Sequence, residues 1–290
     1  MTNDIEIITK EKEIVSSLTN EHFETIEFVD IGWTSRVYLI NNGELVFKFA
    51  RNNKVVEEYK NEVRVYKFLE KKSFEVKLPV VKFEDANLRY FGYEGIVGQT
   101  LDKYIDNLSE KEKIIIGKSL SGFLKILHES NLENINVFDI SHEEKEFFEK
   151  FSISEEFLKT SLKPEIFSAI EFFLENKIKN EFEKLKSNIK LCHGDLGLWN
   201  IILNKNQIGI IDFGDVGYYD SSIDFSGIGD LYMYNSLVKH YECDESMLKK
   251  INIRKIIIPI LEIPYYLEQD NKKELQKNLS QINNLFSSNN

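Results

Sequence analysis

Apolar and polar residues alternate over three short stretches near the start of the chain, residues 24–31, 36–40 and 44–50. A period of two places successive side chains on opposite faces of a strand, so each stretch is predicted to lie in an antiparallel sheet. The segment Asn41-Asn42-Gly43 separates the second stretch from the third. Because Asn and Gly tolerate positive φ angles, an Asn-Gly pair between apolar runs is a strong hairpin signal. A β-hairpin is therefore predicted here.

The period becomes helical over residues 55–69, where apolar residues recur mostly every three or four positions. A second hairpin is predicted from the apolar runs 77–83 and 88–97, with a turn at residues 85–87. The sheet and this one helix together predict a small α+β lobe.

Helical patterns dominate after residue 101. Ser109 and Glu112 have the spacing of a capping box, and apolar residues follow them at spacings of four, three and four. Residues 142–189 are charged and rich in phenylalanine, and we interpret these rings as the core faces of packed helices. Residues 191–212 return to short apolar strands around a polar loop, and helix is predicted again from residue 226.

The composition limits the class of protein. A chain of 290 residues is long enough for two lobes, and 37 Lys and Arg against 48 Asp and Glu give a net charge of −11. This charge disfavours nucleic acid as a partner and suits a cationic ligand. Two cysteines exclude a disulfide framework, and no apolar run approaches the roughly 20 residues that span a bilayer. Without a signal peptide, we expect a cytoplasmic monomer that binds neither nucleic acid nor membrane.

Residues with catalytic potential gather in two segments, His-Gly-Asp-Leu-Gly-Leu-Trp-Asn at 193–200 and Ile-Ile-Asp-Phe-Gly-Asp at 210–215. The apolar runs between them are short enough to pair as a hairpin with a turn at residues 204–207. This pairing would place Asp212 beside Asn200. Carboxylate and amide oxygens are hard ligands, so Asn200 and Asp212 are predicted to bind Mg²⁺.

Asp195 lies close in sequence to these ligands and is predicted to be the catalytic base. Phosphoryl transfer requires charge neutralisation together with a group that orients or deprotonates the attacking hydroxyl. The spacing His-x-Asp-x₄-Asn followed by Asp-Phe-Gly is that of the kinase catalytic loop. We interpret His193 as a hydrogen-bonded scaffold and Cys192 as a small buried hydrophobe.

The same chemistry needs an upstream lysine for the nucleotide phosphates and a glutamate that holds this lysine. Lys48 lies in an apolar strand, where it shares a face with Val46 and Ala50. Glu62 on the following helix is the predicted partner, and Glu57 and Glu58 are the alternatives.

The loop that covers the phosphates is predicted at residues 32–35, Gly-Trp-Thr-Ser. It has a single glycine instead of the G-x-G-x-x-G of protein kinases, so its backbone amides and the hydroxyls of Thr34 and Ser35 are the expected phosphate contacts. Residues 95–98, Gly-Ile-Val-Gly, are the predicted hinge between the lobes. The backbone around Ile96 and Gly98 is expected to bind the purine edge.

With these motifs placed, the chain resembles the aminoglycoside phosphotransferase family, a small-molecule branch of the protein-kinase-like fold. The segment at 210–215 is most similar to that of the 2''-O-phosphotransferases. The resemblance implies an α+β, bilobal fold with an antiparallel-sheet nucleotide-binding lobe at residues 1–97. Residues 98–290 would form a larger, mostly helical catalytic and substrate-binding lobe, in which residues 133–189 are a helical insertion that roofs the acceptor cleft. Asp224 is implied to be structural.

The resemblance also implies the reaction. A Mg²⁺-dependent enzyme of this family moves the terminal phosphoryl of ATP or GTP to a hydroxyl of an aminoglycoside antibiotic and so confers resistance. The cationic acceptor is expected to contact acidic and aromatic residues of the larger lobe. The candidates are Asp230, Glu262, Tyr265, Tyr266, Glu268 and Asp270.

Three other functions remain open at this point. Choline, homoserine, methylthioribose and macrolide kinases share the framework and differ in their acceptor. A nucleotide-binding regulator without transfer activity is a second class, and the presence of Asp195, Asn200 and Asp212 argues against it. A protein kinase is disfavoured, because neither a Gly-rich loop nor an Ala-Pro-Glu motif occurs in the sequence.

Overall fold

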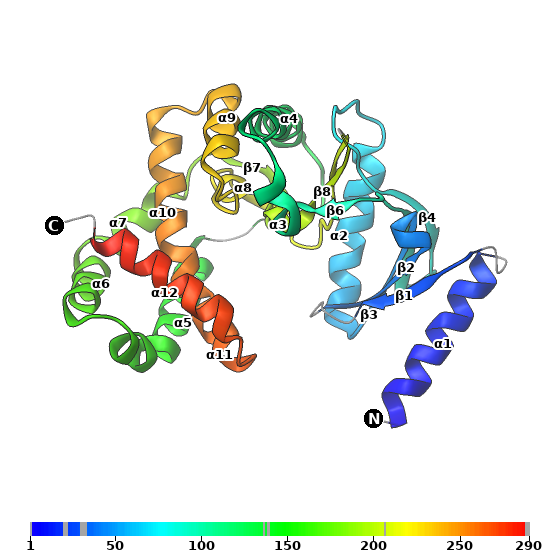
Figure 1. Cartoon of the computed structure of the whole chain (residues 1–290), viewed down its shortest axis with the longest axis horizontal. Helices are drawn as coiled ribbons and strands as arrows, with labels where there is room; N and C mark the ends of the chain where they lie inside the picture. The colour runs from blue at the N-terminus through cyan, green and yellow to red at the C-terminus, as the bar shows by residue number, and fades with distance from the viewer. Residues whose placement is uncertain are drawn as a thin grey trace.

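The computed structural model describes residues 2–19, 23–29, 34–135, 137, 140–205 and 207–287, which form a smaller and a larger lobe (Figure 1). In the smaller lobe, five strands form one antiparallel sheet in the order β1-β2-β3-β5-β4. The strands are β1 (Ile26–Val29), β2 (Ser35–Ile40), β3 (Leu45–Ala50), β4 (Val80–Glu84) and β5 (Tyr90–Glu94). The predicted sheet is confirmed.

The predicted hairpin between β2 and β3 is also confirmed. A short 3-10 turn, Asn41–Gly43, connects the two strands, and the φ angles of Asn41, Asn42 and Gly43 are 49°, 57° and 91°. These positive values explain why Asn and Gly occupy the turn.

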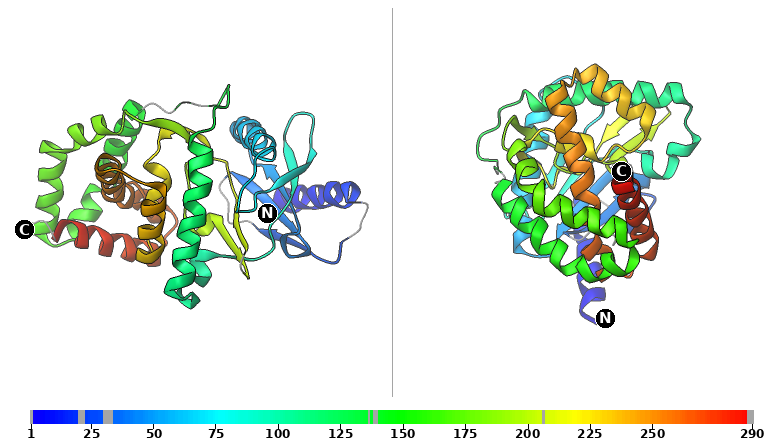
Figure 2. Two further views of the ribbon diagram at one scale, coloured as in Figure 1. Left: turned by 90° about the horizontal axis from the view of Figure 1, so that it is seen from above. Right: turned by 90° about the vertical axis from the view of Figure 1, so that its left-hand side faces the viewer.

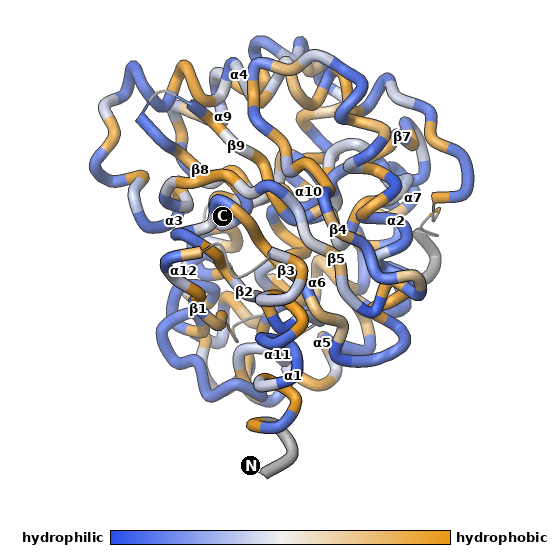
Figure 3. Tube along the Cα trace, turned by 90° about the vertical axis from the view of Figure 1, so that its right-hand side faces the viewer, coloured by the Kyte–Doolittle hydropathy of each residue, from blue (hydrophilic) through white to orange (hydrophobic). Residues whose placement is uncertain are grey.

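Each face of the sheet is covered by a helix. Helix α2 (Asn53–Leu69) begins two residues before the predicted start, because Asn52 caps it by accepting hydrogen bonds from the backbone of Lys54 and Val55. Its apolar side packs on the face of β3 that carries Val46. Figure 3 shows hydrophobic stretches inside this lobe and hydrophilic connections around it.

The other face carries a helix that the sequence analysis did not predict. Helix α1 (Thr2–Leu18) packs there through Val15, which is fully buried with Tyr38. The expectation of a single helix in this lobe was therefore wrong. Figure 1 and the left view of Figure 2 place α1 at the end of the molecule away from the larger lobe.

The larger lobe is mostly helical, as predicted. Its helices are α3 (Leu101–Tyr104), α4 (Glu110–His128), α5 (Ile140–Ser161), α6 (Pro164–Asn176), α7 (Ile178–Lys184), α8 (Ile223–Ser226), α9 (Leu231–Tyr241), α10 (Glu245–Leu261), α11 (Ile263–Glu268) and α12 (Lys272–Ser287). Its short strands are β6 (Gln99–Thr100), β7 (Ile189–Cys192), β8 (Ile201–Asn204), β9 (Gln207–Ile210) and β10 (Gly217–Asp220). The predicted capping box at the start of α4 is present. No helix in the described part of the chain has the length and apolar character needed to cross a membrane.

The phenylalanine-rich region forms α5, α6 and α7, which pack with α10 and α12 around a separate core. Phe147, Phe167 and Phe173 are buried there. Phe148 and Phe172 are 36% and 57% exposed, so the interpretation of all these rings as core was wrong for these two. Period alone could not separate the two groups, because neighbouring phenylalanines lie on different sides of one helix.

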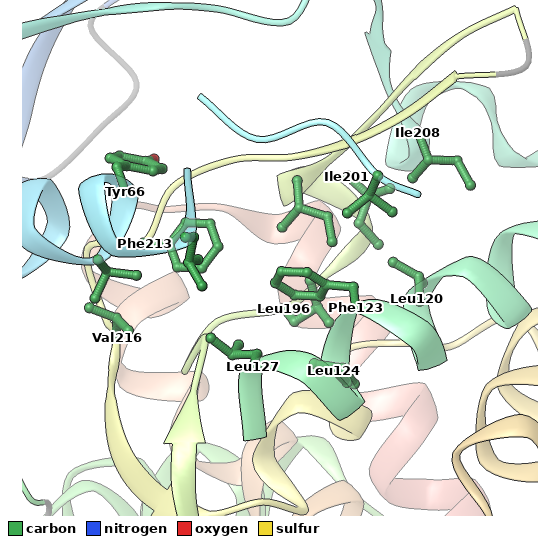
Figure 4. Packing of buried hydrophobic residues seen from close by; sticks show 14 of the residues in the cluster. Tyr66, Leu120, Phe123, Leu124, Leu127, Leu196, Ile201, Ile208, Phe213 and Val216 are labelled. Atoms are coloured by element: carbon green, nitrogen blue, oxygen red, sulfur yellow. The ribbon is translucent and has the colours of Figure 1, made fainter. Parts of the chain in front are cut away.

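A second core continues from the smaller lobe into the larger one. Phe213 packs between Tyr66 of α2 and Phe123 of α4, with ring centroids 5.3 and 6.2 Å away (Figure 4). Phe213 also packs on the imidazole of His193 at 4.5 Å. This packing positions the segments that carry the predicted catalytic residues.

Both edges of the hairpin β8–β9 are hydrogen-bonded to segments that border the smaller lobe. On one edge, β6 pairs antiparallel with β8 directly after the predicted hinge. On the other edge, the Lys77 amide donates to the carbonyl of Ile208 at 2.8 Å, and the Ile210 amide donates to the carbonyl of Lys77 at 3.0 Å. The hairpin is therefore fixed on two sides.

Candidate active site

Lys48 and Glu62 are in contact, as the sequence predicted. The Lys48 Nζ donates to both carboxylate oxygens of Glu62 at 2.8 Å and to Oδ1 of Asp212 at 3.0 Å. Both members of the pair are buried. The alternatives are occupied elsewhere, because Glu57 pairs with Lys60 and Glu58 lies near Lys54.

This buried lysine remains a cation. Burial alone would lower the pKa of Lys48, but the carboxylates of Asp212 and Glu62 raise its pKa well above the usual value. Tyr66 adds a hydrogen bond to Glu62 at 3.1 Å, so the carboxylate that holds Lys48 is itself held. Lys48 can therefore present a fixed positive charge to an anionic ligand.

Asp212 follows β9 in a left-handed backbone conformation, with φ of 63°. Such strain in a residue other than glycine costs about 1–3 kcal/mol and is characteristic of functional positions. Its Oδ1 accepts from Lys48 and, at 3.3 Å, from the Gly214 amide. Burial acts to raise the pKa of Asp212, but the attraction of Lys48 prevails and lowers it. Asp212 is therefore ionised at neutral pH.

The predicted neighbours Asn200 and Asp212 are brought together by the hairpin. The Ile211 amide donates to the Asn200 carbonyl at 3.0 Å, which places the residue before Asp212 opposite Asn200. The Asn200 Nδ2 donates to the backbone carbonyl of Asp195 at 2.8 Å and to its Oδ2 at 3.0 Å. The three residues thus lie in one site.

The Asp195 carboxylate is partly desolvated. Burial raises the pKa of Asp195 to about 6, and a hydrogen bond from Trp199 acts in the opposite direction. The Trp199 Nε1 donates this bond to Oδ2 at 3.1 Å. A carboxylate with a raised pKa is a better proton acceptor than an ordinary aspartate.

His193 is a scaffold, as predicted. Its Nε2 lies 3.0 Å from the Ile211 carbonyl, and its Nδ1 accepts from the Asp195 amide at 3.3 Å. The amides of His193 and Gly194 donate to the two carboxylate oxygens of Asp224 at 2.8 and 2.9 Å. These bonds fix the backbone on which Asp195 stands.

Asp224 is buried and structural, in line with the expectation. It also bonds His128 Nε2 at 3.1 Å, and His128 Nδ1 bonds the Tyr241 hydroxyl at 2.8 Å. The buried thiol of Cys192 lies near both. Because the polar atoms of His128 and Asp224 are already hydrogen-bonded, we interpret this cluster as part of the core. Burial raises the pKa of the Cys192 thiol, which agrees with its predicted role as a buried hydrophobe.

The donor set fits a Mg²⁺ ion. Both amide protons of Asn200 point to Asp195, which leaves Oδ1 for a cation. In the residues that the structure describes, Oδ2 of Asp212 has no hydrogen-bond partner either. An amide oxygen and an ionised carboxylate on a fixed hairpin are the hard ligands that Mg²⁺ prefers.

A pocket of about 570 Å³ lies next to these residues in the larger lobe. Trp199, which bonds Asp195, forms part of its wall, and Glu262 and Tyr266 lie among the other lining residues. The lining also contains the acidic residues Asp102 and Glu274. Burial, assisted by the charge of Glu262, raises the pKa of Tyr266 to about 12. Two of the acceptor candidates therefore line this pocket.

The other acceptor candidates lie outside this lining. Asp230 caps α9 by accepting from the Met233 amide at 3.0 Å, and its other oxygen pairs with Lys113 at 2.9 Å. Both oxygens of Asp230 thus have partners within the protein, which argues against Asp230 as an acceptor contact. Glu268 and Asp270 are exposed and do not line the pocket. Tyr265 packs edge-to-face against Tyr266, with ring centroids 5.0 Å apart, and is not part of the lining either.

The acceptor pocket is not covered by the helical insertion in the way that the resemblance implied. None of the described residues in 133–189 belongs to the lining, which comes instead from α10, α11, α12, the segments around α3 and α8, and Leu198 and Trp199. The Phe-rich helices pack behind α10 and α12, so they support the wall from outside.

The structure describes only part of the predicted phosphate loop at residues 32–35. Gly32 and Trp33 lie outside the described residues. The Ser35 hydroxyl is buried and accepts a hydrogen bond from the Tyr59 hydroxyl at 2.6 Å, which argues against Ser35 as a phosphate contact. Thr34 is the exposed member of the pair.

The hinge contacts the catalytic hairpin. The side chain of Ile96 packs where a Cβ on Gly209 would lie. A Cβ on Gly98 would lie 2.6 Å from the Leu203 carbonyl oxygen, so only glycine fits there. Both predicted hinge residues thus lie next to β8 and β9.

Three residues of the site were not predicted. Trp199 lies inside the catalytic motif, but nothing in its spacing indicated that its indole would bond Asp195. Glu274 and Lys277 line the pocket from α12, where they form an ion pair at 3.2 Å. The polar residues along one face of this C-terminal helix could have indicated in the sequence that the helix lines a pocket.

Comparison with known proteins agrees with this geometry. The model of a phosphotransferase enzyme family matches residues 25–238. The gentamicin complex of APH(2'')-IIa is 25% identical to this chain, with a TM-score of 0.69 over 93% of this chain and 95% of its own.

Two more distant structures share the fold. The GDP complex of wild-type aminoglycoside 2'-phosphotransferase-IIIa is 16% identical, with a TM-score of 0.74 over 98% of this chain and 99% of its own. The macrolide 2'-phosphotransferase of Brachybacterium faecium is 15% identical, with a TM-score of 0.62 over 93% and 98%.

The resemblance drawn from the catalytic motifs and the predicted bilobal, protein-kinase-like fold are both confirmed. The match extends through the sheet of the smaller lobe, the catalytic hairpin and most of α9. The chain belongs to the phosphotransferase enzyme family, and it is a small-molecule kinase.

Proposed function

We propose that this protein transfers the terminal phosphoryl of ATP or GTP to a hydroxyl of an aminoglycoside, with Mg²⁺ bound by Asn200 and Asp212. One observation carries the proposal: hydrogen bonds connect Asp195 through Asn200 to the hairpin that carries Asp212, and through Trp199 to a pocket that bears acidic side chains. The likeness to a gentamicin-bound phosphotransferase supports the choice of acceptor.

In this proposal the lobes divide the work. Residues 1–97 bind the nucleotide, residues 98–290 bind the acceptor and carry the catalytic groups, and the insertion at 133–189 supports the acceptor pocket. Nucleotide and a cationic small molecule are the only partners the mechanism needs, so we propose that a monomer is active.

Lys48 holds the nucleotide phosphates, and Glu62 fixes its position. The exposed Thr34 and the backbone of its loop cover the phosphates, while the backbone near Ile96 and Gly98 contacts the base. When bound, Mg²⁺ neutralises the charge that develops on the transferring phosphoryl group.

Asp195 acts on the acceptor. Its Oδ2 accepts from Asn200 and Trp199, and its Oδ1 has no hydrogen bond from the described residues. Oδ1 can therefore accept a hydrogen bond from the acceptor hydroxyl and take its proton as the oxygen attacks phosphorus. General-base assistance of this kind contributes about 10²–10⁴-fold to rate.

The pocket suits a polycation. Glu262 and Glu274 offer carboxylates for ammonium groups, and Tyr266 offers an aromatic face. Lys277 pairs with Glu274 in the free protein, so binding of the acceptor would replace an internal cation by an external one.

The decisive experiment measures nucleotide turnover with a panel of aminoglycosides, with ATP and GTP tested separately. Stimulation by at least one compound, with stoichiometric transfer of phosphate, is the expected result. A macrolide, choline, homoserine and methylthioribose belong in the same screen. Turnover with one of these alone would reassign the acceptor, and nucleotide binding without turnover on any acceptor would indicate a regulator.

Replacement of the proposed base tests the mechanism. We expect Asp195→Ala to reduce transfer by at least about 10²-fold, because the base is lost, while nucleotide affinity changes less than about twofold. Isothermal titration with a nonhydrolysable nucleotide, together with the turnover assay, separates these two quantities. Retained turnover would exclude Asp195 as the base.

A further inference from the structure

Trp199 is the one pocket-lining residue whose side chain is also hydrogen-bonded to Asp195 among the described residues. Its indole Nε1 donates to Oδ2 of Asp195, the same oxygen that accepts from Asn200 Nδ2. Two donors on one oxygen restrict rotation of the carboxylate. Oδ1, which receives no hydrogen bond from the described residues, is thereby left for the hydroxyl of an acceptor.

The position of the indole ring is built into the local backbone. A Cβ on Gly197 would lie 2.3 Å from Cζ2 of Trp199, so the ring lies directly against this glycine. Any larger residue at 197 would displace the ring and break its bond to Asp195. The side chain is 45% exposed, which leaves part of its surface for the pocket.

The same ring thus contacts the base and the space for the acceptor. The pocket wall near it is formed by Leu198, and Glu262 and Tyr266 lie in the lining contributed by the C-terminal helices. An acceptor held by these groups would lie against the indole. An electron-rich aromatic face attracts ammonium groups and the C–H faces of sugar rings.

We propose that Trp199 is a positioning residue for Asp195 and also a specificity-determining contact for the acceptor. The proposal rests on the proposed function, since it assumes transfer to a cationic hydroxyl compound. The N–H group affects the rate by orienting the carboxylate, and the ring affects the binding of the acceptor.

Two substitutions separate the two roles. Trp199→Phe keeps an aromatic ring and removes the N–H, so we expect kcat to fall about tenfold, the effect of one hydrogen bond to a charged group, with the acceptor KM changed less than about threefold. Trp199→Leu removes both, so kcat should fall similarly and the acceptor KM should rise about tenfold. Nucleotide affinity should stay unchanged in both variants.

Gly197→Ala tests the same contact without altering Trp199. The added methyl group displaces the indole, so we expect its kinetics to resemble those of Trp199→Leu. The matched control is Phe172→Leu, which removes an exposed aromatic ring outside the pocket and should leave all constants unchanged.

A spectroscopic measurement is independent of turnover. The chain contains two tryptophans, so protein labelled with 5-fluorotryptophan should give two ¹⁹F resonances, of which Trp199→Phe removes one. We expect the Trp199 resonance to shift when acceptor is added without nucleotide.

The outcomes are distinct. Wild-type kcat in Trp199→Phe would overturn the positioning role, and an unchanged KM in Trp199→Leu with an unshifted ¹⁹F resonance would overturn the acceptor contact. Parallel losses of thermal stability and nucleotide affinity would show a merely structural residue and overturn both. A wild-type protein that no aminoglycoside stimulates would instead overturn the proposed function, and this inference with it.

Discussion

At the scale of single residues, one ammonium group joins the two lobes. Lys48 extends from β3, contacts Glu62 of the smaller lobe and reaches Asp212 of the larger lobe. Removal of one partner from a buried ion pair leaves an uncompensated charge and costs about 3–5 kcal/mol. The contact therefore matters both for stability and for the position of the phosphates.

The role of Glu62 can be tested against a neighbour on the same helix. We expect Glu62→Ala to lower the melting temperature and to weaken nucleotide binding at least about tenfold, because Lys48 loses the carboxylate that positions it. Glu57→Ala is the matched control, since its pair with Lys60 is exposed and such pairs contribute about 0–1 kcal/mol. Thermal unfolding and nucleotide titration check both variants, and equal effects would contradict the assignment.

Prediction at this scale succeeded where spacing carried the information. Asp195, Asn200 and Asp212 occur at fixed separations beside apolar strands, so their meeting followed from one hairpin. The structure argues against the roles predicted for Ser35 and Asp230, because residue type does not reveal which hydroxyl or carboxylate already has a hydrogen-bond partner within the protein. Those partners come from other elements, and only the folded chain shows them.

At the scale of elements, the ends of helices are specified by short motifs. The Glu112 carboxylate accepts hydrogen bonds from the backbone amide of Ser109 at 2.8 Å and from its hydroxyl at 2.6 Å. These bonds lower the pKa of Glu112 below its ordinary value of 4.5. A depressed pKa in the folded state means stabilisation that is present above the ordinary pKa and is lost as the pH falls through the folded value.

The pH dependence of the capping box follows from this sign. We expect Glu112→Gln to melt at a lower temperature than wild type at pH 7, and the difference to disappear once the pH has fallen below the depressed pKa of Glu112, where the wild-type carboxyl group is also protonated. Glu133→Gln, which alters an exposed carboxylate outside the helix, should show no difference at either pH. Melting curves across this range check the prediction, and a difference that persists at low pH would contradict it.

A polar cluster around Glu11 links helix α1 to the sheet. Glu11 accepts from the Arg36 guanidinium through Nε and Nη2 and from the Tyr38 hydroxyl at 2.8 Å. We expect Glu11→Ala to reduce the free energy of unfolding by about 2 kcal/mol, because the half-buried guanidinium of Arg36 and the buried hydroxyl of Tyr38 lose their bonds to the Glu11 carboxylate. The exposed Glu13 on the same helix is the control. Denaturant titration of Glu11→Ala and Glu13→Ala checks this, and similar values would argue against the cluster.

The absence of α1 from the prediction has a physical cause. Its buried contact is concentrated near its end, at Val15, and a charged residue, Glu11, faces the sheet. Sequence alone does not distinguish a buried glutamate such as Glu11 from a solvent-exposed one. The strands and α2 were predictable because their patterns extend over the whole element.

At the scale of the whole molecule, the lobes meet at a tightly packed crossing, where the hinge at residues 95–98 passes over β8. A Cβ on Gly98 would lie 2.6 Å from both the Leu203 carbonyl oxygen and Cγ2 of Ile202 on β8. The bilobal arrangement could be predicted from the change from strand to helix periodicity near this point. The close approach of the hinge and β8 could not be predicted, because these two backbone segments are far apart in sequence.

Replacement of glycine by alanine should change stability in opposite directions at Gly98, in the crossing, and at Gly122, in α4. We expect Gly98→Ala to lower both the melting temperature and nucleotide affinity, because the methyl group forces hinge and hairpin apart. Gly122→Ala should instead stabilise the protein by about 0.5–1 kcal/mol, since Gly122 lies in the middle of α4 with no atom near its added Cβ. Thermal unfolding and nucleotide titration measure both variants. Stabilisation by Gly98→Ala would show that the crossing has room.

The two-sided attachment of β8–β9 has a consequence for the catalytic cycle. Many two-lobed enzymes lose conformational freedom each time their cleft closes on a ligand, and this loss weakens binding. Here β6, directly after the hinge, holds one edge of the hairpin, and Lys77 of the smaller lobe holds the other, so part of that freedom is lost once, when the chain folds. The pace of successive turnovers should therefore depend more on departure of the products than on reorientation of the lobes.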